Sequence, residues 1–196
     1  MERQGRTGRA WRLAVLVPVL VVATVAGALV SPAEATKRPF CRQPWGIHPK
    51  QLGNNDPGSQ RAVLTGAGAS RTVCYDRLVF NLSGPATGYR VEYVPVVTQD
   101  GSGDPIPLRG GAFLQIVLSA PAHNDAGRPT YLPADRSNAV DVRTFTTFRQ
   151  VAFGGSFEGL TTFGLGVRAK LPFRVVVLPG PGSGSRIAVD VSHRWI

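Results

Sequence analysis

The strongest constraint on the fold is a strict alternation of apolar and polar residues that recurs along most of the chain. In residues 72–84, TVCYDRLVFNLSG, one side of the pattern carries Cys74, Leu78, Phe80 and Leu82. The other side carries Tyr75, Arg77 and Asn81. A period of two is that of a β-strand with one face in the core and the other toward solvent. The alternation therefore predicts strands, with the aliphatic set inward.

Further segments with strand character follow at short intervals, and Gly- and Pro-rich turns divide them. They are residues 88–94, 112–120, 139–145, 148–155, 160–168, 173–179 and 185–192. Residues 94–108 read as a hairpin whose turn lies at 100–104. Gly164 and Gly166, inside one of the strands, predict a bulge or a close backbone approach. Since no helical period intervenes, we predict an all-β fold, an antiparallel β-sandwich or barrel-like single domain over residues 61–196.

The N-terminus has the layout of a secretory signal. Four arginines lie within residues 1–12, an uncharged apolar stretch covers residues 13–30, and Ala33-Glu34-Ala35 forms an A-x-A site. We predict a signal peptide over residues 1–35 that is cleaved after Ala35. The alternative is an uncleaved signal-anchor helix, because the apolar stretch approaches the ~20 residues that cross a bilayer. The protein is then secreted or wall-associated, or membrane-anchored through this segment alone.

The chain is strongly basic, with a net charge of +10. Removal of four arginines and two glutamates with the signal lowers this to +8. Such a charge favours an anionic partner, either an acidic wall polymer or an envelope protein, and export argues against nucleic acid. The alternative is a basic surface that is simply solvated.

Cys41 and Cys74 are the only cysteines of the sequence. In an exported chain, two cysteines predict a disulfide. It would tie down residues 36–60, an extended segment rich in Pro, Gly and Asn that contains Trp45. We expect Trp45 to pack on the domain, while a solvent-facing Trp45 would offer a platform for a sugar or an acyl group.

The stretches YDRLVFNLSG and SRIAVDVSHRW echo each other a hundred residues apart. If they are neighbouring strands, Arg77 and Asp190 form a cross-strand pair on the face opposite the aliphatic set, worth roughly 0.2–1 kcal/mol. The apolar face then explains the pairing, and the charged face is left for a partner. We predict Arg77, Arg90 and Tyr93 as that binding surface.

Catalytic patterns are weak, and we expect no enzyme, no cofactor and no metal site. His48, His123 and His193 are widely spaced, which gives no sign of a zinc site. His123 and Asp125 lie in a loop typical of an Asx turn, and Ser156 lacks the spacing of a nucleophile elbow. Residues 179–185, PGPGSGS, read as a hairpin loop.

Several motifs together resemble the AMIN-like domain of exported actinobacterial proteins and lipoproteins. They are PWGIHPK, Cys74 just before Tyr-Asp-Arg, GYRVEYV, PLRGGAFLQIVLSAPAH, FRVVVLPGPGSGSR and RIAVDV. The resemblance spans Cys41 to Trp195 and implies a non-catalytic module of the cell envelope that binds peptidoglycan. Our leading hypothesis is therefore a module that binds anionic wall material. The alternative is a β-barrel-like carrier of a small hydrophobic or lipid ligand, which would need an internal cavity.

Overall fold

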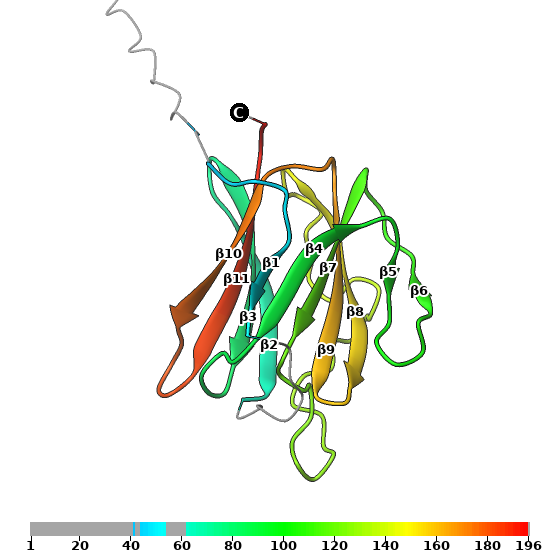
Figure 1. The fold of residues 1–196 in the computed structure, drawn as a ribbon, viewed down its shortest axis with the longest axis vertical. Helices are drawn as coiled ribbons and strands as arrows, with labels where there is room; N and C mark the ends of the chain where they lie inside the picture. The colour runs from blue at the N-terminus through cyan, green and yellow to red at the C-terminus, as the bar shows by residue number, and fades with distance from the viewer. Residues whose placement is uncertain (1–40, 42–43, 54–61, 196) are drawn as a thin grey trace, which may run out of the picture. The chain divides into compact units, whose positions relative to one another are not determined.

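In a computed structural model of the chain, residues 41, 44–53 and 62–195 are described (Figure 1). They belong to one unit, which covers residues 38–196. The expected signal peptide and most of segment 36–60 lie outside the described residues. The described part is built of strands, as predicted, and all of their pairings are antiparallel.

The strands of the described residues form two larger sheets and one small hairpin sheet. The first sheet has the order β1-β4-β7-β9-β8, the second β10-β11-β3-β2, and the third pairs β5 with β6. The bounds are β1 Lys50–Leu52, β2 Leu64–Arg71, β3 Tyr75–Leu82, β4 Tyr89–Val94, β5 Val97–Thr98, β6 Pro105–Ile106, β7 Ala112–Leu118, β8 Phe148–Phe157, β9 Leu160–Val167, β10 Phe173–Pro179 and β11 Ser185–Ser192.

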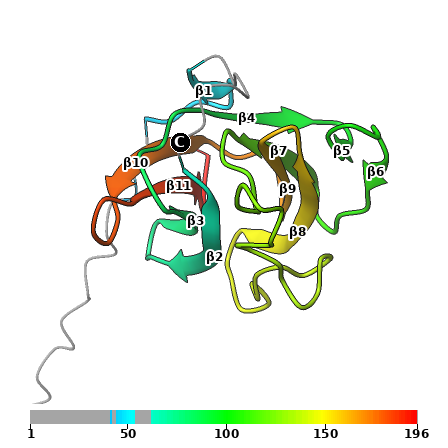
Figure 2. The ribbon, with the colours of Figure 1, turned by 90° about the horizontal axis from the view of Figure 1, so that it is seen from below.

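The two larger sheets pack face to face and enclose the hydrophobic core (Figure 2). The alternating apolar residues provide it, as predicted. Fully buried examples are Leu78 and Phe80 of β3, Leu114, Ile116 and Leu118 of β7, and Ile187 and Val189 of β11. Phe80 meets Phe163 of the opposite sheet with ring centroids 4.7 Å apart. Each such buried side chain contributes about 1.5–3 kcal/mol relative to exposure.

The two echoing stretches are neighbouring strands, which confirms the pairing expected from their sequence. β3 and β11 pair along their full length, with Arg77 opposite Asp190 and Leu78 opposite Val189. Arg77 and Asp190 therefore lie on the face of the second sheet opposite to Leu78 and Val189.

The β5–β6 hairpin covers the outer face of the first sheet, and the glycines of β9 make room for it. A Cβ on Gly164 would lie 2.8 Å from Leu108 Cδ1, and one on Gly166 would lie 1.9 Å from Arg109 O. The close backbone approach predicted at these glycines is therefore confirmed. β9 pairs with β7 in an unbroken register, whereas its register with β8 shifts between Phe148 and Gln150, opposite Val167 and Gly166.

Residues 139–145, predicted as a strand, form an irregular segment instead. Asp141 Oδ1 accepts a hydrogen bond from Arg143 N at 3.1 Å, and Phe145 N donates to Val142 O at 3.1 Å. Both bonds join residues close in sequence and close turns. The Asp141 side chain takes a backbone N–H group that a strand partner would otherwise bind, so the segment does not form a strand. Val142 is buried, so apolar character here reflects packing of a loop.

Two strands were missed by the sequence patterns. β1 lies in the segment expected to be extended and tied down by the disulfide, and it pairs with β4 (Gln51 opposite Arg90). β2, LTGAGASR, carries small residues that give little alternation, yet it pairs with β3.

The predicted disulfide Cys41–Cys74 is present. It fixes the start of a segment that we call the strap, residues 44–52, which ends in β1. Within the strap, Gly46 O accepts a hydrogen bond from Phe173 N at 3.1 Å, and Lys50 Nζ lies 4.7 Å from the centroid of the Phe173 ring. The strap therefore contacts β10 of one sheet and β4 of the other.

Candidate functional site

A pocket of about 480 Å³ lies where the β2–β3 turn meets the segment that follows β11. We call it the basic end pocket. Its lining residues are Cys41, Arg71, Thr72, Val73, Thr146, His193 and Arg194. The ladder between β3 and β11 continues beyond the strands, since His193 N donates to Cys74 O at 2.9 Å. This pairing brings His193 and Arg194 beside the turn.

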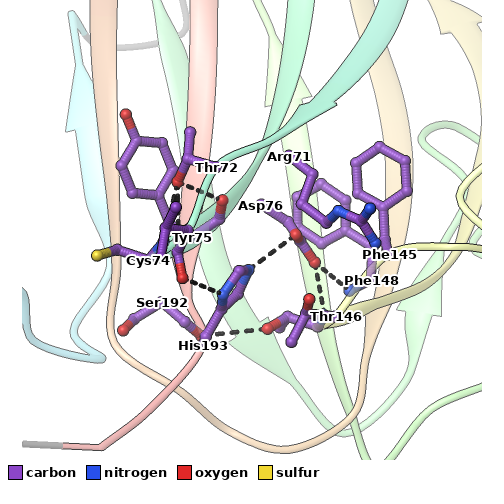
Figure 3. A network of polar contacts seen from close by, with 12 residues as sticks. Arg71, Thr72, Cys74, Tyr75, Asp76, Phe145, Thr146, Phe148, Ser192 and His193 are labelled. Atoms are coloured by element: carbon purple, nitrogen blue, oxygen red, sulfur yellow. Dashed lines mark hydrogen bonds and ion pairs between the residues drawn. The ribbon is translucent and has the colours of Figure 1, made fainter. Parts of the chain in front are cut away.

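Beneath the pocket, a fully buried carboxylate organises the surrounding backbone (Figure 3). Asp76 Oδ2 accepts hydrogen bonds from Thr147 N at 2.5 Å and Phe148 N at 3.0 Å. Asp76 Oδ1 lies 2.9 Å from His193 Nε2. One carboxylate thus joins β3, the start of β8 and the segment after β11.

The His193 ring lies between two acceptors. Its Nε2 faces Asp76 Oδ1, and its Nδ1 lies 3.1 Å from Val73 O. Each ring nitrogen thus lies within hydrogen-bonding distance of an oxygen, which fixes the orientation of the ring. The pair fixes the ring at the pocket wall, where the side chain is 10% exposed.

Positive charge dominates the pocket lining. Arg71 donates one hydrogen bond to Thr144 O, which leaves its other guanidinium N–H groups available. Arg194 is exposed, and among the described residues no acceptor contacts its guanidinium. Among the described residues, the lining includes no carboxylate, and Asp76 lies behind His193. An anion in this pocket would therefore meet two arginines at its rim.

A second polar cluster lies on the outer face of the second sheet. Asp190 is fully buried and accepts from Arg77 Nε at 2.6 Å and Arg174 Nε at 2.9 Å. Arg174 lies over the Trp45 ring, 4.4 Å from its centroid, and Trp45 meets Tyr75 edge to face at 5.5 Å. The hydrogen bond to Asp190 raises the pKa of Arg77. Burial acts in the opposite direction, and the negative charge of Asp190 adds to the increase.

This cluster corrects the expectation that the charged face is open. The predicted Arg77–Asp190 pair exists, but a second arginine shares the carboxylate, and Trp45 packs against the same group. Trp45 therefore lies on the domain, as expected. A buried carboxylate between two arginines depends on its partners far more than an exposed cross-strand pair does.

The other two predicted binding residues lie elsewhere. Arg90 is on the outer face of β4, in the first sheet, and pairs with Glu92 at 2.7 Å. Tyr93 points between the sheets: its hydroxyl donates to Leu171 O at 2.7 Å, and its ring meets Phe173 edge to face. Burial raises the pKa of Tyr93 to about 12. The structure thus brings Arg77 and Trp45 together and places Arg90 and Tyr93 apart from them.

The loops examined for catalysis have structural contacts. Asn124 Oδ1 accepts from Ala126 N at 3.1 Å and Arg128 N at 3.0 Å, so the loop around His123 is an Asx-type turn. Ser156 Oγ donates to Leu160 O at 3.0 Å. Residues 179–185 join β10 to β11 as a hairpin loop, as predicted, with Gly180 N bonded to Gly184 O. Within the described residues, no group of three potential metal ligands gathers.

The sequence model of the AMIN-like domain matches residues 62–193. The chain belongs to the AMIN-like domain family. AMIN-like domains are in general extracytoplasmic, non-catalytic modules associated with the cell envelope. No curated protein and no solved structure matches the chain. Among the described residues of this AMIN-like chain, no helix has the length and apolarity needed to cross a membrane.

The sequence patterns did not predict the basic end pocket, although Asp76 indicated a buried polar network near it. Asp76 falls on the inward side of β3, in phase with Leu78 and Phe80. A charged residue at a core position indicates a buried network. His193 and Arg194 follow the last strand without a recognisable pattern, so only the register of β11 on β3 reveals them.

Proposed function

We propose that this AMIN-like chain is an exported, non-catalytic module that binds anionic wall material, such as peptidoglycan, through the basic end pocket. The observation that carries the proposal is the pair of arginines, Arg71 and Arg194, at the rim of a pocket whose described lining has no carboxylate. Guanidinium groups bind carboxylates through paired, charge-assisted hydrogen bonds.

Three further features support this role. Cys41 lines the pocket, and its disulfide to Cys74 fits an oxidising, extracytoplasmic compartment. The N-terminal pattern is that of a secretory signal. The Asp76–His193 pair holds the pocket wall in place, so the arginines extend from a fixed frame rather than from a free terminus.

The four residues expected from sequence remain a second, subordinate proposal. Arg77 and Trp45 can act together because Arg174 and Asp190 join them, and Trp45 is partly exposed beside the Arg174 guanidinium. Arg90 would act separately, from the opposite sheet. Tyr93 would contribute only by supporting Phe173 and Leu171 from within.

Binding to insoluble peptidoglycan tests the function. We expect the purified domain to co-sediment with the polymer, and the bound fraction to fall as salt rises, because charge-led contacts are screened. Failure to co-sediment even at low salt would remove the proposal.

Charge-neutral variants locate the site. Arg71→Gln and Arg194→Gln should each weaken binding by roughly 10- to 100-fold, since a hydrogen bond to a charged group is worth roughly 1.5–3 kcal/mol. Arg128→Gln, which makes the same charge change in the exposed loop 123–130, is the matched control and should retain binding. Equal losses in all three variants would mean that net charge, and not the pocket, drives retention.

The carrier hypothesis gains no support from the core. Phe80, Phe153 and Phe163 meet between the sheets, with Phe153 and Phe163 centroids 5.3 Å apart. These rings occupy the space that a carrier would keep for its ligand.

A further inference from the structure

The outer edge of β10 is an exposed sheet edge with an apolar sequence. β10 ends the second sheet, and both views place it at the margin of the domain (Figures 1 and 2). Its residues 173–179 read FRVVVLP. Exposed edge strands of this kind offer unpaired N–H and C=O groups to another strand.

The hydrogen-bond pattern identifies which groups of β10 point outward. Antiparallel strands bond through alternate residues on each side. Thr72 N donates to Tyr75 O, and His193 N donates to Cys74 O. The backbone groups of odd-numbered residues in β3 therefore point toward β2, and those of even-numbered residues point toward β11. The registers of β3 with β11 and of β11 with β10 extend this pattern to β10. The backbone N–H and C=O groups of Arg174, Val176 and Leu178 therefore point toward β11. The backbone groups of Phe173, Val175 and Val177 therefore point away from the sheet.

Both ends of this outward row are closed. Phe173 N already donates to Gly46 O of the strap at 3.1 Å, which agrees with the deduced pattern. Pro179 has no N–H group to offer. With respect to the part of the chain that the structure describes, the available donors are thus Val175 N and Val177 N, which lie symmetrically about Val176.

The side chains along this window are suited to contact with another apolar strand. Val177 is 43% exposed, and Val175 and Val176 are partly exposed. The one charged residue of the strand, Arg174, is paired with Asp190 at 2.9 Å. Two copies brought together here would therefore not confront unpaired charges of the same sign.

We infer that two copies of this chain pair antiparallel along β10, with the two-fold axis at Val176. In this register Val175 of one copy faces Val177 of the other, and all four outward N–H groups find acceptors. A shift of the axis to Val175 opposes Val177 to Phe173, whose N–H is taken, and a shift to Val177 opposes Val175 to Pro179. Only in the register centred on Val176 does each facing residue of the Val175–Val177 pairs have a free N–H as well as a C=O, so that both pairs exchange two hydrogen bonds. The contact is also self-complementary, as a two-fold interface requires.

The small contact implies a weak dimer. A single strand pair buries less than the roughly 1,200 Å² of a stable interface. We therefore expect association that depends on protein concentration. It goes beyond wall binding, and it would present two basic end pockets on one assembly.

Disulfide trapping tests the register directly. In the proposed dimer, residue 176 of each copy meets its counterpart as a non-hydrogen-bonded pair, the close type of antiparallel pair. Val176→Cys should give a cross-linked dimer on mild oxidation. Leu178→Cys, on the same face of the same strand, should not, because the two copies of residue 178 lie about 13 Å apart, four residues along the strands. Equal cross-linking of the two variants, or none, would overturn the register.

Sedimentation of the chain without added cysteines tests the association. The wild-type domain should shift from monomer toward dimer as concentration rises from micromolar to millimolar, and Val177→Lys should abolish the shift. Val96→Lys, the same change at another exposed valine, should leave it intact. A wild-type chain that stays monomeric throughout would overturn the proposal and leave the edge open to a strand of another protein. Since wall binding is measured separately, loss of the dimer leaves the proposed function standing.

Discussion

Two buried aspartates hold different parts of this domain together. Asp76 accepts two backbone N–H groups and faces His193 inside the end of the sandwich. Asp190 lies on the outer face and is shared by Arg77 and Arg174. Both carboxylates are fully buried, so each depends on its partners to offset the loss of water. The two carboxylates hold different segments in place. Asp76 fixes the wall of the basic end pocket, and Asp190 fixes the strap through Arg174 and Trp45.

Replacing Asp76 should test how much the buried network contributes. Asp76→Ala leaves Thr147 N and Phe148 N without an acceptor, so we expect a loss of about 3–5 kcal/mol in the free energy of unfolding. Asp76→Asn keeps an acceptor oxygen and should cost less. Urea denaturation measures both. Asp125→Ala, at an exposed aspartate, should change stability by no more than about 0.5 kcal/mol, and a similar small effect of Asp76→Ala would contradict this assignment.

Tyr93 should make stability depend on pH at the alkaline end. Its pKa rises from 10.0 to about 12 on burial, so the folded state favours the protonated phenol. The stabilisation is complete below pH 10 and is lost as the pH rises toward 12, because the unfolded chain releases its proton first. Tyr93→Phe should remove the highest step of the tyrosinate absorbance titration and flatten the fall in stability over this range. A variant with an unchanged titration would refute the assignment.

Among the strands, those with several β-branched or aromatic residues could be predicted from the sequence, and β1 and β2, which have few of them, could not. β3, β4, β7 and β11 combine β-branched or aromatic residues with a period of two, because each has one face in the core. β2 escaped prediction because its glycines and alanines carry too little side chain to show a pattern. Residues 139–145 were misassigned because buried Val142 gives a loop the apolar content of a strand. The pocket escaped because it depends on tertiary register, which local patterns do not encode.

Two glycines in strands should respond oppositely to the same substitution. In Gly166→Ala the new Cβ would lie 1.9 Å from Arg109 O, so the backbone must move, and we expect a loss of about 2–3 kcal/mol. A Cβ on Gly68 of β2 would meet nothing within 4 Å. Gly68→Ala should therefore be neutral or stabilise by roughly 0.5 kcal/mol, since it restricts the unfolded chain. Thermal unfolding of both variants measures the contrast, and equal shifts would mean that β9 does not hold the 108–109 backbone as closely as described.

The strap links the two sheets of the domain at its margin. Its first fixed point is the disulfide to Cys74, just before β3 of the second sheet, and its last is β1, paired with β4 of the first sheet. Between them, Gly46 and Trp45 contact β10 and its Arg174. The disulfide before the strap thus contributes Cys41 to the lining of the basic end pocket, and the strap itself closes the Phe173 end of the β10 edge. A single covalent bond therefore affects both surfaces to which we assign a partner.

Removing that bond should destabilise the domain and loosen the pocket while leaving the sheets paired. Closing a loop between residues 33 apart is worth about 3–4 kcal/mol in the chain-entropy picture, so Cys41→Ser with Cys74→Ser should lose about that much. Denaturation of the wild type with a reductant should reach the same value, which distinguishes loss of the bond from effects of serine. Peptidoglycan retention should fall as well, because Cys41 lines the pocket beside Arg71 and Arg194. Unchanged retention in a destabilised variant would show that the arginines alone form the site, and that the strap acts only on stability.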